Sequence, residues 1–373
     1  MTANTAIDRE PVRYTPPTGQ TEASIAQLYA EVLKLDPAAV SSASSFFDFG
    51  GTSLDVIRLK KKLEHRFDLV SVPLATILQN PTVRALAVSC TPVVESRGYD
   101  PVVPLQVRGK KAPLFCVHGE TGEVLGFLRL AKYFADDRPF YALRTRGFNE
   151  GETCFDTFEE MVRTYTDAIC WHQPDGPYAL AGYSYGAPVA FEIAKALESR
   201  GERVAFLGII DMPPWLKYPF DAVDCAIGLA LLLALIDARQ AEAVPDRFRT
   251  AGGAEHLCAF LMEVARPERV AKLDLSLPGF KAWTAVVQSL LGACESYVAS
   301  GTVESATVFY ADPPRGTKQG WLTNQLECWD DFARMPNRYI DVSGEHHTLM
   351  GPKHVSRFQA VLRSELNRAL RGH

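Results

Sequence analysis

The first part of the chain has apolar residues at helical spacing. In one stretch the residues three or four positions apart are apolar: Ile25, Leu28, Tyr29, Val32 and Leu33. This spacing predicts an amphipathic helix from about Thr21. Similar patterns at 53–67, 74–78 and 82–87 predict three more short helices, and no strand pattern separates them. We therefore expect a small all-α, four-helix domain over residues 21–91.

From residue 105 onward, short apolar runs alternate with helical patterns. The apolar runs predict strands at 114–117, 140–143, 178–181, 204–210, 306–310 and 338–342. Amphipathic patterns predict helices at 158–171 and 187–197 between them. Repeated alternation of strand and helix is typical of a mostly parallel sheet that is covered by helices. We therefore expect an α/β domain over residues 105–373.

The alternation stops between Trp215 and about Ser300, where helical patterns dominate. A long insertion between two strands of a sheet is usually functional. We therefore expect a helical lid at about 215–300. The insertion carries an apolar stripe that is compatible with packing over a substrate or against the sheet: Leu229, Leu232, Leu233 and Ile236.

Two segments that contain several prolines flank the helical domain. Residues 1–20 are polar and contain Pro11, Pro16 and Pro17, which predicts a flexible leader. Residues 92–104 contain three more prolines and a glycine, which is typical of an interdomain linker. The expected order is therefore leader, helical domain, linker and α/β domain with a lid.

Composition and charge narrow the function classes. The chain has 373 residues, 47% of them hydrophobic and 22% charged, which is ordinary for a globular protein of more than one domain. A net charge of −5 gives no indication of nucleic-acid binding. The longest apolar run, Cys225–Ile236, is too short for a membrane span, and the first residues lack the pattern of a signal peptide. The eight cysteines form no CxxC, so neither a metal site nor a disulfide framework is indicated, and a cytoplasmic location is expected.

A serine at the start of the second predicted helix is a candidate for covalent modification. Ser53 ends the sequence Phe-Phe-Asp-Phe-Gly-Gly-Thr-Ser, in which Gly50 and Gly51 allow a sharp turn. A helix start suits a phosphodiester, because its free N–H groups and its dipole attract anions. The alternative is that Ser53 only caps the helix. The motif, within a small helical module, favours covalent attachment.

A second serine lies in a nucleophile motif. The sequence Gly182-Tyr183-Ser184-Tyr185-Gly186 stands between a predicted strand and a predicted helix, which is the context that G-x-S-x-G requires. A serine hydroxyl needs a base, and in α/β hydrolases the acid and the histidine follow the serine in the chain. His346 and His347 follow the last predicted strand, and either can be the base. Asp211 and Asp312 each follow a predicted strand, and either can be the acid.

Such a nucleophile also requires two backbone N–H groups that stabilise an oxyanion. Tyr185 is the expected first donor, because it directly follows the nucleophile. The second donor is expected in His118-Gly119-Glu120-Thr121-Gly122, the turn after the strand at 114–117, and Glu120 is our candidate. We interpret His118 itself as structural.

Four segments carry a resemblance to a known family. They are Gly-Thr-Ser-Leu-Asp-Val at 51–56, Arg-Gly-Tyr-Asp-Pro-Val-Val at 97–103, Ala-Gly-Tyr-Ser-Tyr-Gly at 181–186 and Gly-Glu-His-His-Thr-Leu-Met at 344–350. Through them the chain resembles the thiolation–thioesterase end of fungal non-ribosomal peptide synthetase-like enzymes of the atromentin and terrequinone synthetase type.

This resemblance implies particular roles and partners. It implies that Ser53 carries 4′-phosphopantetheine, and that Ser184, Asp211 and His346 form the catalytic triad of a thioesterase with the α/β-hydrolase fold. Asp211 is then preferred to Asp312, and His346 to His347. The implied partners are an upstream adenylation domain, a phosphopantetheinyl transferase and aryl-pyruvyl substrates.

The family's reaction joins two aryl pyruvic acids through carbon–carbon bonds. The resemblance therefore implies acyl transfer from a phosphopantetheine thioester on Ser53 to Ser184, followed by Claisen-type dimerisation and release of a quinone- or furanone-type product. The residues alone indicate only acyl transfer, so two alternatives stay open. One is hydrolytic or lactonising release of a peptide, and the other is a carrier and docking module with an inactive hydrolase fold.

Overall fold

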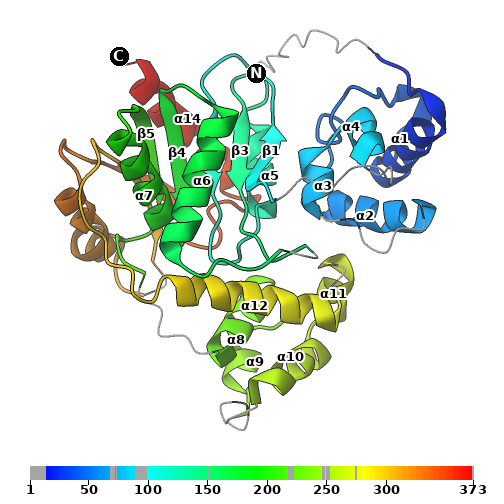
Figure 1. Cartoon of the computed structure of the whole chain (residues 1–373). Helices are drawn as coiled ribbons and strands as arrows, with labels where there is room; N and C mark the ends of the chain where they lie inside the picture. The colour runs from blue at the N-terminus through cyan, green and yellow to red at the C-terminus, as the bar shows by residue number, and fades with distance from the viewer. Residues whose placement is uncertain are drawn as a thin grey trace, which may run out of the picture. The chain divides into compact units, whose positions relative to one another are not determined.

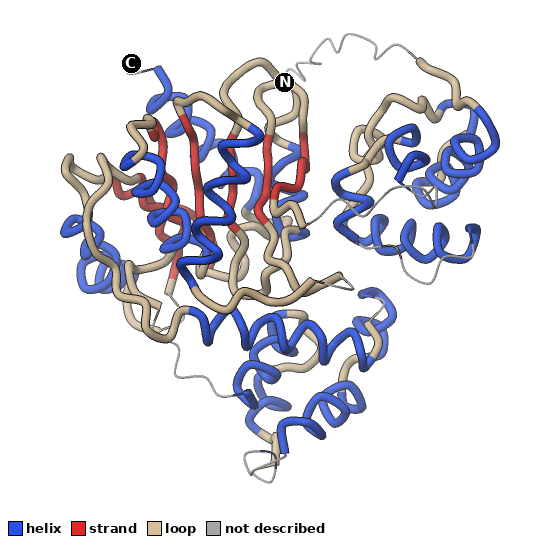
Figure 2. The backbone as a smooth tube through the Cα atoms, viewed as in Figure 1, coloured by secondary structure: helices blue, strands red, loops and turns tan. Residues whose placement is uncertain are grey.

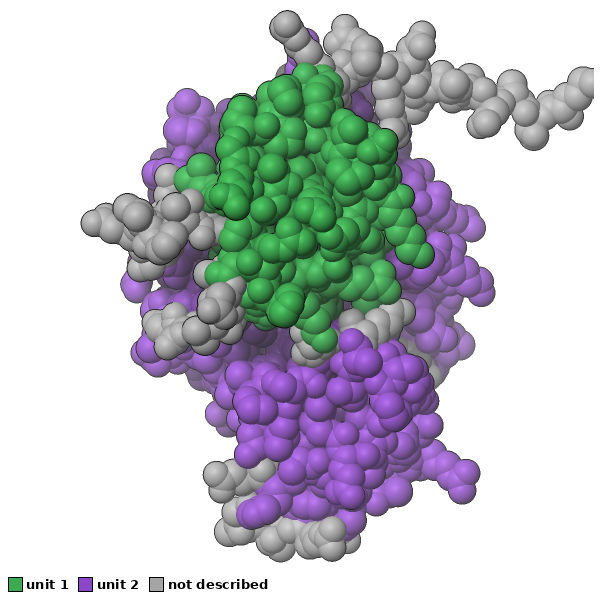
Figure 3. Space-filling view, turned by 90° about the vertical axis from the view of Figure 1, so that its right-hand side faces the viewer, with its two compact units in different colours: residues 1–97 green, residues 98–373 purple. Residues whose placement is uncertain are grey.

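The chain divides into two compact units, residues 1–97 and 98–373 (Figure 3). A computed structural model describes residues 14–67, 72, 74–89, 99–149, 152–216, 222–245, 248, 253–273, 275–313 and 315–371. Most of the predicted leader and most of the predicted linker lie outside these residues.

The first unit is the predicted small helical domain (Figure 2). Its elements are α1 (Gly19–Leu33), the 3₁₀ helix η1 (Pro37–Ala39), α2 (Ser53–Phe67), α3 (Leu74–Gln79) and α4 (Val83–Ser89). The apolar face of α1 is buried, as its three- and four-residue spacing requires. Tyr29 on this face packs edge-on against Phe46, and its hydroxyl donates to the carbonyl of Pro81 at 2.9 Å. Helix α1 begins at Gly19, so the last two residues of the predicted leader 1–20 belong to this helix.

The second unit is built on a seven-stranded sheet with the order β1-β3-β2-β4-β5-β6-β7. The strands are β1 (Val102–Gln106), β2 (Leu114–Val117), β3 (Phe140–Leu143), β4 (Tyr178–Tyr183), β5 (Val204–Ile210), β6 (Thr307–Asp312) and β7 (Arg338–Glu345). Strand β1 pairs antiparallel with β3, and all the other pairs are parallel. The α/β architecture predicted from the alternating pattern is confirmed.

Helices cover both faces of this sheet (Figure 1). Helices α6 (Phe158–His172) and α7 (Gly186–Ser199) pack on one face, and α5 (Leu128–Lys132) and α14 (Val355–Arg371) on the other. The described residues of this unit also form short elements outside the insertion: η2 (Leu125–Phe127), α13 (Lys318–Trp321), the π-helix η4 (Leu322–Leu326) and η5 (Glu327–Phe332). The core beneath α6 and α7 contains a large apolar cluster, with Phe115, Leu180 and Phe191 completely buried.

Strand β1 corrects the predicted linker 92–104. Val102 and Val103 of this segment are buried and paired with β3, so the α/β unit begins before residue 105. Pro104 is compatible with a strand here, because β1 lies at the edge of the sheet and needs hydrogen bonds on one side only.

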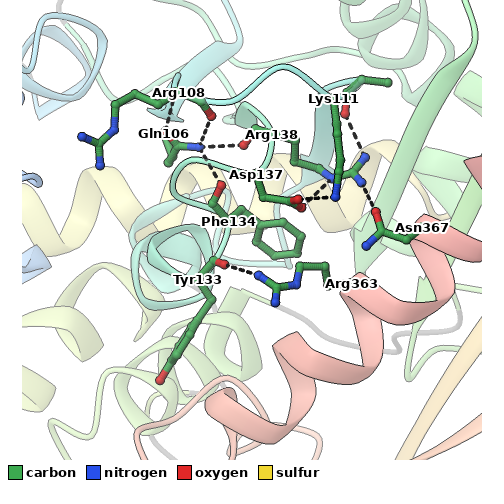
Figure 4. Close-up of polar contacts among 10 residues, drawn as sticks. Gln106, Arg108, Lys111, Tyr133, Phe134, Asp137, Arg138, Arg363 and Asn367 are labelled. Atoms are coloured by element: carbon green, nitrogen blue, oxygen red, sulfur yellow. Dashed lines mark hydrogen bonds and ion pairs between the residues drawn. The ribbon is translucent and has the colours of Figure 1, made fainter. Parts of the chain in front are cut away.

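A buried arginine connects α14 to this edge of the sheet (Figure 4). The guanidinium of Arg138, which is completely buried, donates to the carbonyl of Ala112 at 2.9 Å and to the Asn367 side chain on α14. The side-chain amide of Gln106 donates to the backbone carbonyls of Arg108, Phe134 and Arg138, the last at 2.6 Å. A buried cation is tolerated when its donors are satisfied, so this network fixes the C-terminal helix.

The described residues of the predicted insertion at about 215–300 form five α-helices. They are α8 (Ala222–Leu232), α9 (Ala238–Glu242), α10 (Gly253–Val264), α11 (Pro267–Leu273) and α12 (Leu277–Ala293). Leu229, Leu233 and Ile236 of the apolar stripe are buried in a cluster that belongs to the insertion itself, whereas Leu232 is 36% exposed. The stripe is therefore mainly the insertion's own core. None of the helices in the described part of the chain is both long and apolar enough to cross a membrane.

Candidate active site

The turn between β4 and α7 presents Ser184 in a strained conformation. Ser184 has a φ of +54°, and its side chain is almost completely buried. A Cβ atom at Gly182 would lie 2.0 Å from the carbonyl oxygen of Gly186, and one at Gly186 would lie 2.3 Å from that of His118. Both positions therefore require glycine, which explains the spacing of the motif. This is the strand–turn–helix geometry of a nucleophile elbow.

Two residues far away in the sequence meet Ser184. His346 directly follows β7, and its Nε2 lies 2.9 Å from Ser184 Oγ. Asp211 directly follows β5, and its Oδ2 lies 2.9 Å from His346 Nδ1. The carboxyl ends of parallel strands meet at one edge of a sheet, so three separate strands deliver the three residues to one place. The hydroxyl of Tyr183 also donates to the His346 carbonyl at 2.7 Å, and the two rings are stacked.

The surroundings of Asp211 suit a charged carboxylate. Its Oδ1 accepts hydrogen bonds from the N–H of Ala311 and from Nε1 of Trp321, each at 2.9 Å. Burial alone would raise the pKa of Asp211, but the hydrogen bond and attraction to His346, together with these donors, hold the pKa below its usual range. Asp312 is different, because its side chain is 56% exposed and pairs with Lys318 at 3.3 Å. The structure therefore brings Asp211, not Asp312, to His346.

The pKa values of the two neighbouring histidines are shifted in opposite directions. Burial favours neutral His346, but the hydrogen bond and charge of Asp211, with a contribution from Glu120, raise the pKa of His346 above its ordinary value. Burial and the adjacent His346 lower the pKa of His347, whose ring stands perpendicular to the first. His346 is thus the histidine that the site is arranged to protonate.

The Glu120 side chain reaches the nucleophile. Its Oε2 lies 3.0 Å from Ser184 Oγ. The sequence directed attention only to the backbone N–H of Glu120, so this carboxyl group is a site feature that sequence reasoning missed. The available signal was an acidic residue three positions after the end of β2, at the same edge of the sheet as Ser184.

His118, in the same turn, has a structural environment. It is completely buried, its Nδ1 lies 2.7 Å from the Gly119 carbonyl, and its Nε2 lies 2.8 Å from the Tyr165 hydroxyl. Burial lowers the pKa of His118 to about 4, so the ring is neutral near neutral pH. These contacts fix the turn that carries Glu120.

Helix α12 of the insertion is bonded to both catalytic turns. Trp283 Nε1 donates to the Thr121 carbonyl at 2.9 Å, next to Glu120. The hydroxyl of Tyr185 donates to the Leu290 carbonyl on α12, also at 2.9 Å. A Cβ atom at Gly122 would lie 3.3 Å from the side chains of both Leu290 and Val286. The insertion is therefore attached directly beside Ser184.

In the first unit, Ser53 begins α2 after a tight turn. Gly50 has a φ of +96°, and a Cβ atom at Gly51 would lie 2.4 Å from the Phe46 ring. Thr52 donates from its N–H and its hydroxyl to Asp55 Oδ2, at 3.0 and 2.6 Å. These bonds put Thr52 in the capping position, so the start of α2 does not require Ser53 as its cap. Capping by Thr52 is compatible with a role of Ser53 in covalent attachment of a cofactor.

Comparisons with known proteins identify the class. A family model described as thioesterase domain matches residues 112–362, and one described as phosphopantetheine attachment site matches residues 23–87. The chain therefore belongs to the thioesterase family, as an enzyme of α/β-hydrolase fold joined to a carrier domain for covalent 4′-phosphopantetheine.

Named relatives make the assignment more specific. The chain is 42% identical over 360 residues to the atromentin synthetase invA1 of Paxillus involutus and to an atromentin synthetase of Tapinella panuoides. These matches include 95% of the chain but only 37–38% of the relatives. The chain is thus a thiolation–thioesterase didomain that is similar to part of these atromentin synthetases and spans well under half of their length. A relative named inactive atromentin synthetase invA4, also from Paxillus involutus, is 41% identical, so identity alone does not determine activity.

Solved structures support the fold. A four-domain non-ribosomal peptide synthetase, holo-AB3403, matches 96% of the chain with a TM-score of 0.63 and 20% identity, and the match includes 27% of that chain. The Vlm2 thioesterase domain with a bound dodecadepsipeptide matches 70% of the chain and 96% of its own, with a TM-score of 0.54 and 22% identity. At such identities these structures inform on fold and not on substrate.

Proposed function

We propose that the chain transfers an acyl group to Ser184 and then joins it to a second acyl unit through a carbon–carbon bond. The observation that carries this proposal is the presence of two places for an acyl group on one chain. One is the carrier domain with Ser53 at the start of α2, and the other is Ser184 in contact with His346 and Asp211. Two sites on one chain hold both reactants at high effective concentration, which favours coupling.

Acylation begins with the Ser184 hydroxyl. His346 Nε2, 2.9 Å from Oγ, takes its proton while Oγ attacks the carbonyl carbon of a thioester. Asp211 holds His346 in the required tautomer and stabilises the imidazolium that forms. The oxyanion is stabilised by the N–H groups of Tyr185 and Glu120, and His346 returns the proton to the leaving thiolate.

Ser53 is the residue that we assign to the cofactor. When attached, 4′-phosphopantetheine supplies a flexible thiol that holds an acyl group as a thioester. The chain's own contribution is a serine at a glycine turn and a helix start, where a phosphodiester is favoured. The proposal includes a phosphopantetheinyl transferase and an upstream adenylation domain as partners.

The names of the relatives support aryl pyruvates as the acyl units. We propose that two such units are coupled to a quinone- or furanone-type product rather than hydrolysed. The test uses the full chain, modified with coenzyme A and a phosphopantetheinyl transferase and loaded with an aryl pyruvate by a partner adenylation domain. We expect mass spectrometry to detect a dimeric product. Release of only the monomeric acid, with every aryl group tried, would contradict the proposal and favour the hydrolytic alternative.

The alternative of an inactive hydrolase fold has a separate test. Ser184 and His346 are in contact, and the pKa of His346 is raised, so the hydroxyl faces a working base. We expect a fluorophosphonate probe to label Ser184. A folded chain that resists the probe would support the carrier and docking reading.

We further propose that the insertion acts as a lid that keeps water from the ester on Ser184. Trp283→Phe keeps an aromatic ring on α12 but removes the hydrogen bond to the Thr121 carbonyl. A bond of this kind contributes about 0.5–1.5 kcal/mol, so we expect the ratio of hydrolysed to coupled product to rise by up to about tenfold. The ratio is measured by chromatography of the released products.

The matched control is Trp171→Phe on α6, where the tryptophan is 75% exposed. This variant should keep the ratio of the unmodified chain. If Trp283→Phe also keeps it while remaining folded, the lid role is wrong.

A further inference from the structure

The Ser184 hydroxyl lies between two groups that can accept its proton. Its Oγ is 2.9 Å from His346 Nε2 and 3.0 Å from Glu120 Oε2. His346 Nδ1 donates to Asp211, which leaves Nε2 as an acceptor in the neutral ring. A hydroxyl has a single hydrogen to donate, and seryl acylation needs a single base. The Glu120 carboxyl group therefore has no role in a triad mechanism, although it touches the reacting oxygen.

We propose that Glu120 is a second catalytic base, which removes a proton from the methylene carbon of the acyl unit on Ser184. The inference rests on the proposed condensation. In this proposal Glu120 is the base for the formation of the first carbon–carbon bond. His346 remains the base for acylation of Ser184 and the acid for the final cleavage of the ester.

The position of Glu120 suits this step. After acylation Oγ has no hydrogen, so Glu120 Oε2 faces an ester. The methylene of an aryl-pyruvyl ester is three covalent bonds from Oγ, and a general base acts within about 2.6–3.2 Å of the proton-bearing atom. Glu120 follows β2 and His346 follows β7, so the two bases come from different strands. The raised pKa of His346, to which the charge of Glu120 contributes, agrees with a carboxyl group that faces the same centre.

The step balances without any further reactant. The C–H bond of the methylene breaks, and its proton goes to Glu120. The electron pair of the carbanion forms a carbon–carbon bond with the carbonyl carbon of a second acyl thioester, and the C–S bond breaks. The thiolate then takes the proton from Glu120, which returns to its starting state.

A second base also avoids a conflict at His346. When the ester is finally cleaved, His346 must give a proton to Oγ. If His346 had already taken the methylene proton, an imidazolium would face Oγ during the first bond formation and would promote loss of the ester. Two bases separate the formation of the bond from the release of the product.

The test compares Glu120→Gln and Glu120→Asp with the unmodified full chain. Four quantities are measured: labelling of Ser184 by a fluorophosphonate, acylation by an aryl-pyruvyl thioester, deuterium uptake from D₂O into the methylene of the Ser184 ester, and dimeric product. The first two need the triad and the backbone N–H groups that stabilise the oxyanion, and Glu120→Gln keeps both. The last two need a base at the methylene. Glu345→Gln is the control, because it removes an exposed carboxyl group beside the same histidines.

For Glu120→Gln we expect any loss of labelling and acylation to be at least tenfold smaller than the loss of dimer, together with at least tenfold slower deuterium uptake and about 10²–10⁴-fold less dimer, which is the usual loss when a general base is removed. Glu120→Asp should keep part of the dimer, and Glu345→Gln nearly all of it.

Unchanged deuterium uptake and dimer in Glu120→Gln would overturn the role of Glu120 while leaving the condensation intact. A loss of labelling equal to the loss of dimer would also overturn it, since Glu120 would then act on the hydroxyl. If the unmodified chain forms no dimer but Glu120→Gln slows deuterium uptake, the condensation fails and the base assignment stands.

Discussion

Replacing Ser184 or His346 with Ala is expected to lower acyl release by about 10⁶-fold, and replacing Asp211 with Asn by about 10⁴-fold. The three residues act as one unit, because Ser184 Oγ, the His346 ring and the Asp211 carboxylate form a continuous hydrogen-bonded chain. Without Asp211 the ring loses its orientation and the partner that raises its pKa. Steady-state hydrolysis of an aryl-pyruvyl thioester by the full chain measures each loss.

Asp312→Asn is the matched control for the acid. Asp312 follows the neighbouring strand β6, but its carboxylate is exposed and pairs with Lys318. We expect its rate to stay within a few-fold of the unmodified chain. A crippled Asp312→Asn beside an active Asp211→Asn would show that the wrong aspartate was chosen.

Much of the fold was predictable because its elements follow simple periodic patterns. Helix α2 has the predicted bounds, and β2, β3 and β5 do too. Helix α14 was not predicted, although its buried residues Val355, Phe358, Leu362 and Leu366 lie three or four positions apart. Strand β1 was hidden by Pro104 within it and Pro101 before it, because prolines indicate a linker unless the strand is known to lie at a sheet edge.

The site was predictable in part for a topological reason. A residue that directly follows a strand of a parallel sheet must lie at one edge, so the positions of Asp211 and His346 could be deduced from strand ends alone. The choice between Asp211 and Asp312 could not, since it depends on which carboxylate turns inward. The contact between Glu120 and Ser184 depends on the conformation of the turn after β2, which includes the left-handed Gly122. Periodicity contains no information on such a turn.

Ser53→Ala is expected to abolish attachment of the phosphopantetheine arm. The unmodified chain, treated with coenzyme A and a phosphopantetheinyl transferase, should gain the mass of one arm in intact-mass spectrometry, and the variant should gain none. The physical reason is that α2 begins at Ser53 behind a glycine turn, where Gly51 packs against Phe46 and the helix N–H groups favour a phosphodiester.

The control that gives this result its meaning is Thr52→Ala. It removes the neighbouring hydroxyl and its bond to Asp55, and loss of such a cap costs about 1 kcal/mol of stability. The chain should therefore unfold at a slightly lower temperature but still accept the arm, because Thr52 holds the helix start while Ser53 receives the modification. An arm that persists in Ser53→Ala, or that disappears only in Thr52→Ala, would move the attachment site away from Ser53.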